Sequence, residues 1–315
     1  MSFTLKDSIG PAGLTKGRAE AALAGQTLAN RYDVLELLGT GGMGAVYRAR
    51  DRELDDIVAL KVIRKELAAE PAMVERFRHE VKLARRVTHV NVARTFELGT
   101  VDGLMYCTME LVDGQALSAR LQQRSKLQVG EAVAIACAVC DGLAAAHAAN
   151  VIHRDIKPDN ILLASDGRVV LADFGVAAAG VGAAGELSGT PAYMAPEQAR
   201  GESPRPAADV YAVGVVLAEM LSGRCPFSGD ALAILDDKQQ LERVVLTEVP
   251  PELAVVVGQA TARDVDARIQ SAAALRRTLE PWARGMTRMP TQPQRSATDS
   301  AELTTVVVVA PASKH

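Results

Sequence analysis

The stretch His153-Arg154-Asp155-Ile156-Lys157-Pro158-Asp159-Asn160, followed by Asp173-Phe174-Gly175, decides how this chain is interpreted. These residues provide carboxylate and carboxamide groups, a lysine and an arginine. They are expected on two short loops that are connected by a pair of strands. Carboxylate and amide oxygens are ligands that magnesium accepts. Such a group of residues can hold two magnesium ions, bring a hydroxyl up to a phosphate and neutralise the charge that moves. The stretch therefore predicts a site for phosphoryl transfer.

A glycine cluster lies nearer the N-terminus, in Gly39-Thr40-Gly41-Gly42-Met43-Gly44-Ala45-Val46. Because glycine has no β-carbon, the backbone can approach a triphosphate with its amide groups facing the oxygens. Dinucleotide-binding folds use similar glycines, but there the glycines lead from a strand into a helix. Here the flanking segments 32–38 and 45–50 both have strand character, which predicts a hairpin. Taken alone, the motif also fits a glycine-rich turn that binds nothing.

Lys61 lies in the apolar strand-like segment 58–63, where a lysine costs free energy unless it is paired. Its expected partners are nucleotide phosphates and a carboxylate on the helix that residues 71–87 predict by their apolar spacing. Glu80 is the first candidate, because it lies in the middle of this helix near the buried face. Glu75 is the second candidate and lies close to the helix start. Glu80 as a solvated surface acid is the alternative.

The order of the remaining elements predicts an α+β fold with a small β-rich lobe and a larger α-helical lobe. Strands are expected near 93–98 and 104–111, and the main helices at 129–149, 207–222 and 271–284. We expect residues 1–30 to form a flexible N-terminal extension and residues 31–284 to fold, with the first lobe at about 31–112 and the second at about 113–284. The Thr-, Gln-, Pro- and Ser-rich residues 285–315 read as a disordered tail.

Composition narrows the classes of function. The 315 residues are 48% apolar with a formal net charge of −3, which gives no support to a nucleic-acid surface. No run of about 18 apolar residues is uninterrupted, so no membrane span is expected. The four cysteines suit a reducing cytoplasm, and the Cys137-x-x-Cys140 pair reads as small residues packed in a helix, because neither a second pair nor a histidine partner lies near it.

Two further phrases complete a resemblance, namely Leu37-Leu38-Gly39-Thr40-Gly41-Gly42-Met43-Gly44 and Gly189-Thr190-Pro191-Ala192-Tyr193-Met194-Ala195-Pro196-Glu197. Over roughly residues 30–284 the chain resembles the bacterial branch of the eukaryotic-like (Hanks-type) serine/threonine protein kinases. The resemblance implies the bilobal kinase fold, ATP and Mg²⁺ (with Mn²⁺ as a substitute), and protein substrates with serine or threonine acceptors, this chain included. Activation through a homodimer is a further expectation.

Residue by residue, the resemblance implies that Asp155 accepts or orients the acceptor proton and that Lys157 offsets charge near the γ-phosphoryl group. Asn160 and Asp173 would hold magnesium. Thr190 would help to position the substrate. The adenine base would be clasped by the side chains of Leu38, Val46 and Ala59 above and Leu162 below, with Met109 at the back and backbone groups of Glu110 and Val112 in the linker.

The resemblance also implies supporting roles. His153 and Phe174 would be hydrophobic struts between the two loops. Glu197 would form a buried ion pair with Arg268, and Asp209 would brace the catalytic-loop backbone.

The segment between Gly175 and Gly189 departs from the family pattern, because it contains no threonine. Ser188 is then the candidate phosphate acceptor next to Arg154, or Glu186 partly substitutes for a phosphate. The tail serines and threonines are further candidates for autophosphorylation. An inactive scaffold would be expected to lack one of Lys61, Asp155, Asn160 or Asp173. A small-molecule kinase would be expected to lack the segment that ends at Glu197.

Overall fold

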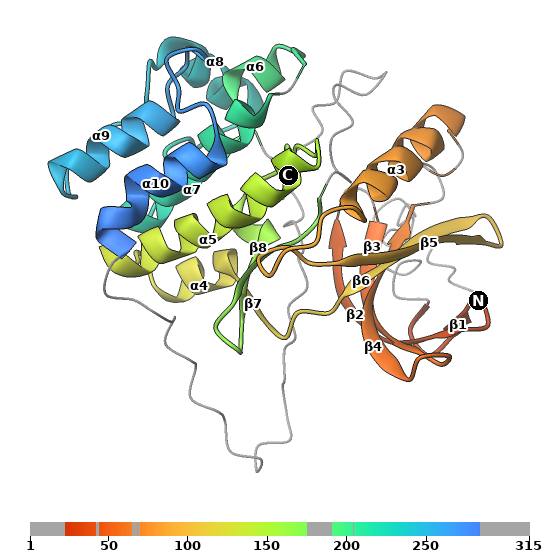
Figure 1. Cartoon of the computed structure of the whole chain (residues 1–315). Coiled ribbons are helices and arrows are strands. Elements are labelled where there is room, and N and C mark those ends of the chain that lie inside the picture. The colour runs from red at the N-terminus through yellow and green to blue at the C-terminus, as the bar shows by residue number, and fades with distance from the viewer. Residues whose placement is uncertain are drawn as a thin grey trace, which may run out of the picture.

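A computed structural model of the chain describes residues 23–41, 44–64, 68, 70–174, 191–203 and 205–283. The N-terminal lobe is built on an antiparallel six-stranded sheet of order β1-β2-β3-β4-β6-β5 (Figure 1). Its strands are β1 (Thr27–Leu28), β2 (Tyr32–Gly41), β3 (Gly44–Asp51), β4 (Asp56–Ile63), β5 (Thr95–Val101) and β6 (Leu104–Glu110). The hairpin predicted around the glycine cluster is confirmed as β2 and β3.

The folded lobe begins earlier than residue 31, so the expected flexible extension to residue 30 was too long. Thr27 and Leu28 pair with Asp33 and Tyr32 of β2, and the Leu28 side chain is buried. This strand could not be predicted, because two residues are too few to show a periodic pattern. Residues 1–22 and 284–315 lie outside the described residues, so the expectations for the tail stay predictions.

One helix, α3 (Pro71–Ala84), packs against this sheet. Pro71 occupies the first turn, where its missing N–H costs nothing. Phe77, Val81 and Ala84 are buried at helical spacing, as the sequence predicts. The helix ends three residues before the expected Val87. This arrangement places Glu80 on the side of the lobe that faces the catalytic loop.

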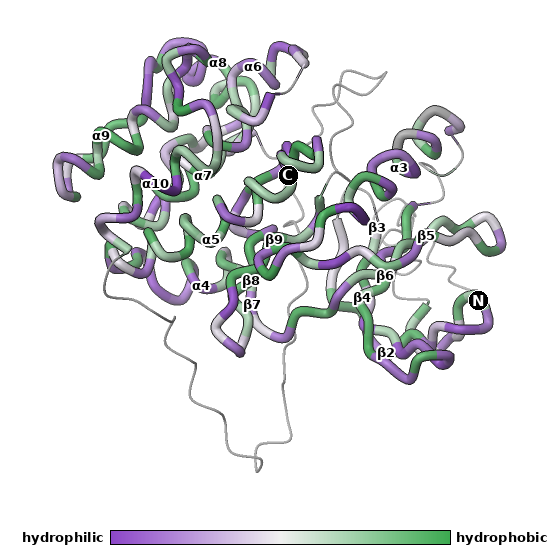
Figure 2. Tube along the Cα trace, viewed as in Figure 1, coloured by the Kyte–Doolittle hydropathy of each residue, from purple (hydrophilic) through white to green (hydrophobic). Residues whose placement is uncertain are grey.

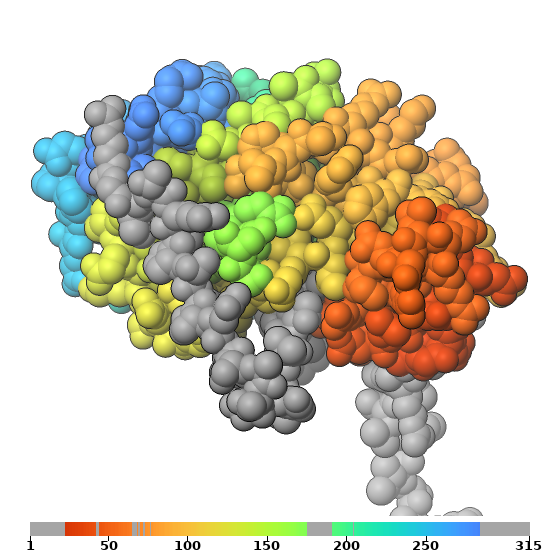
Figure 3. Space-filling view, turned by 60° about the horizontal axis from the view of Figure 1, so that its bottom comes forward, coloured from red at the N-terminus to blue at the C-terminus, as the bar shows by residue number. Residues whose placement is uncertain are grey.

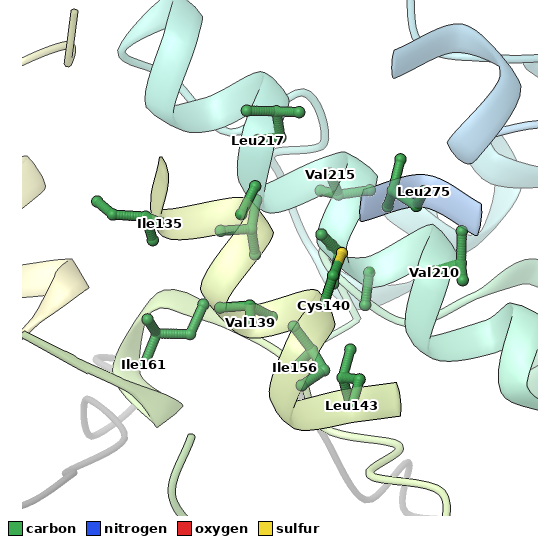
Figure 4. Close-up of a cluster of buried hydrophobic side chains, with 14 of the residues drawn as sticks. Ile135, Val139, Cys140, Leu143, Ile156, Ile161, Val210, Val215, Leu217 and Leu275 are labelled. Atoms are coloured by element: carbon green, nitrogen blue, oxygen red, sulfur yellow. The ribbon is translucent and has the colours of Figure 1, made fainter. Parts of the chain in front are cut away.

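The C-terminal lobe is helical and is organised around α5 (Val129–Ala148), α7 (Pro206–Ser222) and α10 (Ala272–Ala283). In Figure 4 the side chain of Cys140 from α5 lies near those of Val215 from α7 and Leu275 from α10, and Leu143 of the same helix lies beside Ile156. The remaining helices are α4 (Leu117–Gln123), α6 (Pro196–Ala199), α8 (Ala231–Gln240) and α9 (Pro251–Ala260).

By length and composition α5 could cross a membrane, but it lies in the middle of this lobe and is largely buried by it. Figure 2 shows hydrophobic residues in green along α5. Cys137 and Cys140 are free and buried, so they pack in a helix as expected. The apolarity of α5 therefore serves the core of the lobe.

A second, three-stranded sheet carries the two loops that the sequence singled out. It has the order β7-β8-β9, with β7 (Gly114–Ala116), β8 (Ile161–Ala164) and β9 (Val169–Leu171). The short 3-10 helix η2 (Pro158–Asn160) leads into β8, and Asp173 follows β9. The strand pair β8 and β9 therefore brings Asn160 and Asp173 together. Figure 3 shows the small lobe, in red to orange, against the larger lobe, in yellow to blue.

Candidate active site

Asp155 lies at the centre of a hydrogen-bonded loop. The Lys157 Nζ donates to Asp155 Oδ2 at 2.8 Å, and the Asn160 Nδ2 donates to the same oxygen at 3.0 Å and to the Asp155 carbonyl at 2.7 Å. These bonds hold the carboxylate in one orientation. Among the described residues Asp155 Oδ1 receives no hydrogen bond, so it can accept one from an incoming hydroxyl. Asp155, Lys157 and Asn160 are thus brought together as predicted.

Asp209, in the first turn of α7, braces the backbone of this loop as the resemblance implies. Its carboxylate accepts the backbone N–H of His153 at 2.9 Å and that of Arg154 at 2.8 Å. Arg154 has a φ of 69°, a left-handed conformation that costs a non-glycine residue free energy. His147 also contacts the Asp209 carboxylate at 2.8 Å. The strained backbone next to Asp155 is therefore held by a buried anion on a core helix.

Oxygens on two adjoining loops suit a divalent cation. Asn160 Oδ1 is buried and has no hydrogen-bond partner among the described residues, a state that costs free energy unless an ion or water occupies the site. Asp173, with a φ of 60°, presents its carboxylate on the adjoining loop. The preceding carbonyl, that of Ala172, lies 3.0 Å from His153 Nε2, and the His153 and Phe174 rings pack at 4.5 Å. His153 and Phe174 are thus the struts that were expected. The donor set of one amide and one carboxylate oxygen suits a hard cation.

Lys61 does not pair with Glu80 here, which corrects the expectation from the sequence. Lys61 Nζ lies 2.8 Å from Asp173 Oδ1, whereas Glu80 Oε1 lies 3.9 Å from Arg154 Nη1. Burial acts to lower the pKa of Lys61, but the charge and hydrogen bond of Asp173 outweigh it and the pKa is raised. Lys61 and Asp173 therefore form an ion pair between the two lobes.

The glycine hairpin approaches β4 closely at one position. A β-carbon built on Gly44 would lie 1.9 Å from the Val62 carbonyl oxygen, so only glycine fits there. Gly41, by contrast, has open space where a β-carbon would be. Gly42 and Met43 lie outside the described residues. The close approach therefore fixes the end of β3 next to the turn of the hairpin, and that turn is the part expected to cover phosphates.

The residues expected around the adenine base fall into two clusters. Val46, Ala59 and Met109 are buried in one cluster with Leu38 against it, and Leu162 lies in the other with Val112. Between these clusters the chain passes from one lobe to the other. The Glu110 backbone N–H donates to the Arg94 carbonyl at 2.8 Å, which leaves the Glu110 carbonyl as its group for the base.

The segment that ends at α6 is anchored to the helical lobe. Arg268 Nη1 and Nη2 lie 2.6 Å and 3.0 Å from the two oxygens of Glu197, and both side chains are buried. This is the ion pair that the resemblance implies. The Tyr193 hydroxyl donates to Glu219 at 2.7 Å. Thr190, Ser188 and Glu186 lie outside the described residues, so their expected roles stay predictions.

Sequence reasoning missed two residues beside this segment. Gln198 accepts the Ala195 N–H at 3.0 Å, and its Nε2 donates to the Arg154 carbonyl at 3.2 Å, which ties the segment to the catalytic loop. Lys238 of α8 donates to two carbonyls of the segment. A signal existed for Lys238, because it follows the buried Ile234 by four residues on the same helix face.

Comparisons with known proteins agree with this geometry. The model of the protein kinase domain family matches residues 32–279. Serine/threonine-protein kinase PknL of Mycobacterium tuberculosis is 39% identical over 275 residues, which are 84% of this chain and 68% of that protein. Serine/threonine-protein kinase pkn3 of Myxococcus xanthus is 36% identical over 299 residues, or 89% of this chain and 55% of that one.

A solved structure gives the same result for the fold. The Mycobacterium tuberculosis PknI kinase domain is similar with a TM-score of 0.66 and 30% identity, over 82% of this chain and 99% of that one. The bilobal kinase fold predicted from the sequence is thus confirmed. With its catalytic loop, metal-loop aspartate and anchored Glu197 segment, this chain belongs to the protein kinase family, as a bacterial Hanks-type serine/threonine protein kinase.

Proposed function

We propose that the loops around Asp155 and Asp173 transfer the γ-phosphoryl group of ATP to serine and threonine hydroxyls of proteins, with the residue roles given below. The observation that carries this proposal is the hydrogen-bonded set of Asp155, Lys157 and Asn160, in which Asp155 Oδ1 and Asn160 Oδ1 have no hydrogen-bond partner among the described residues. Asp155 Oδ1 accepts the hydrogen bond of the acceptor hydroxyl and orients its oxygen toward the phosphorus. Lys157 offsets the negative charge that spreads over the γ-oxygens.

Magnesium is the proposed metal, and Asn160 Oδ1 and Asp173 would hold it. When bound, it would neutralise part of the negative charge of the phosphates. Mn²⁺ accepts the same oxygen ligands, so it is the expected substitute. Lys61 would bind the α- and β-phosphates, and Thr190 would help to position the acceptor. The chemistry needs positioning and charge neutralisation more than covalent help.

The wider setting is proposed from composition. A net charge of −3 and four free cysteines favour protein substrates in the cytoplasm, with neither nucleic acid nor a membrane as partner. Phosphorylation of its own Ser188 or tail residues, and activation through a homodimer, complete the proposal.

A transfer assay tests the proposal. The purified protein is incubated with labelled ATP and myelin basic protein, with and without magnesium, beside Asp155→Asn. We expect phosphoserine and phosphothreonine in the product, dependence on magnesium, and a loss of about 10²- to 10⁴-fold in Asp155→Asn. Asp141→Asn is the matched control, because among the described residues Asp141 of α5 makes a half-exposed pair with Arg276 of α10 and no hydrogen bond to the catalytic loop. Wild-type activity that survives in Asp155→Asn would contradict the role of Asp155.

A further inference from the structure

Lys238 is a buried lysine that the phosphoryl-transfer chemistry does not use. It lies in α8, and only 1% of its surface is exposed. Its Nζ lies 4.4 Å from the centre of the Phe227 ring and 5.1 Å from that of Tyr211. A leucine or methionine would pack against these rings without losing the hydration of a charge. The burial of an ammonium here therefore needs another explanation.

The explanation lies in the segment that precedes α6. Lys238 Nζ donates to the carbonyl of Ala192 at 2.8 Å and to that of Met194 at 2.6 Å. Neither carbonyl accepts an amide hydrogen bond among the described backbone groups. A partly buried carbonyl without a donor costs free energy, so one ammonium satisfies two backbone groups that the turn at residues 191–194 does not satisfy itself.

These two bonds complete a series of anchors along the segment. Ala192 and Met194 are held by Lys238, and Tyr193 between them is held by Glu219. Glu197 follows with its buried pair to Arg268. Four neighbouring residues of the segment are thus fixed to three different parts of the helical lobe.

The other end of the segment is tied to the catalytic loop. Gln198 binds the Ala195 N–H and donates to the carbonyl of Arg154, the residue before Asp155. A shift of residues 192–194 is therefore a shift of the surface beside Asp155. The nucleotide elements β2, β3 and β4 belong to the other lobe and do not include these anchors.

We propose that Lys238 is a positioning residue for the protein substrate, which fixes residues 192–194 as the surface on which the acceptor peptide lies next to Asp155. This inference rests on the proposed transfer to protein hydroxyls. It goes further because it assigns substrate affinity to a residue on α8 that contacts neither nucleotide nor metal ligand. The conformation of residues 192–194 depends on the Lys238 side chain. A substitution of Lys238 should therefore change the affinity for the acceptor peptide.

Steady-state kinetics of Lys238→Met test the inference, because methionine keeps the length and the packing against Phe227 but donates no hydrogen bond. We expect the KM for myelin basic protein to rise about tenfold and the KM for ATP to stay within twofold, since one lost charged hydrogen bond is worth about that factor. Lys238→Arg keeps the cation and should recover part of the affinity. Lys126→Met, which removes an exposed lysine on the same lobe, should match wild type in both constants.

Three outcomes overturn the inference. One is an unchanged KM for myelin basic protein in folded Lys238→Met, and another is an equal rise in both KM values. If Lys238→Met does not fold, hydrogen exchange of the wild-type amides in 192–197 decides, and exchange as fast as in an exposed loop would refute the anchoring. A wild-type protein that transfers no phosphate at all would instead refute the proposed function.

Discussion

The ammonium of Lys61 lies 2.8 Å from the carboxylate of Asp173. Both groups are expected to serve the nucleotide, Lys61 through phosphates and Asp173 through a cation. The proposed function therefore predicts that Lys61 and Asp173 part from each other when a nucleotide and its cation bind. Glu80 of α3, the carboxylate that the sequence predicts as the partner of Lys61, lies 3.9 Å from Arg154.

Glu80→Gln tests this change of partner. We expect kcat/KM for ATP to fall about tenfold to thirtyfold, because Lys61 loses the carboxylate that orients it once Asp173 is taken by a cation. Glu75→Gln is the control, because Glu75 is exposed and, among the described residues, pairs with Arg78 on the same helix. Equal effects of the two variants in the kinetic assay would contradict the change of partner.

Gly44→Ala should destabilise the small lobe. The added β-carbon would meet the Val62 carbonyl at 1.9 Å, so β3 must move away from β4, at a cost of about 1–3 kcal/mol. Gly41→Ala in the same hairpin meets no atom and should leave the free energy of unfolding within about 0.5 kcal/mol. Urea unfolding measures both. An equal loss in the two variants would show that glycine flexibility, and not the close approach, matters at residue 44.

Most of the fold could be predicted because its elements carry local patterns. Apolar residues recur at helical spacing in 71–84, and residues 58–63 form a mostly apolar stretch. The predicted bounds of this helix and this strand therefore lie within three residues of the observed bounds. The partner of Lys61 could not be found this way, since it depends on which charge the other lobe presents. The same holds for Lys238, whose acceptors are backbone carbonyls 44 and 46 residues away in the chain. Sequence motifs thus identify the residues of the site, whereas contacts between distant segments of the chain determine which of those residues pair with each other.

The Glu197 and Arg268 pair should contribute strongly to stability when only one partner is removed. Arg268→Met leaves a buried carboxylate unpaired and should cost about 3–5 kcal/mol in the free energy of unfolding. Replacing both, as Glu197→Leu with Arg268→Met, should cost less than Arg268→Met alone. Arg276→Met breaks the half-exposed pair with Asp141 and should cost about 0–1 kcal/mol. If the double variant were the least stable of the three, the pair would be favourable beyond the cost of burying it.

The stability contribution of Lys238 should depend on pH. Burial lowers the pKa of its ammonium to about 7, against which the charges of Cys225 and Glu197 act only weakly. Arg268, another cation, contacts the Tyr211 ring that also faces Lys238, and burial raises the pKa values of Tyr211 and Cys225. Lys238 is therefore the group of this cluster that is expected to titrate first above neutrality.

In the unfolded chain Lys238 titrates near pH 10.4, so between about pH 7 and pH 10 the unfolded state binds a proton that the folded state has released. Stability from this group therefore rises with pH across that window, by at most about 1.4 kcal/mol per pH unit. We expect the unfolding free energy of wild type minus that of Lys238→Met to increase by about 2–3 kcal/mol from pH 7 to pH 9.5. Urea unfolding at several pH values measures it, with Lys126→Met as the control that should show no such trend. If this difference in unfolding free energy stayed constant with pH, the pKa of Lys238 would not be lowered in the folded protein. Its contacts with the two carbonyls and the two rings would then keep it protonated despite its burial.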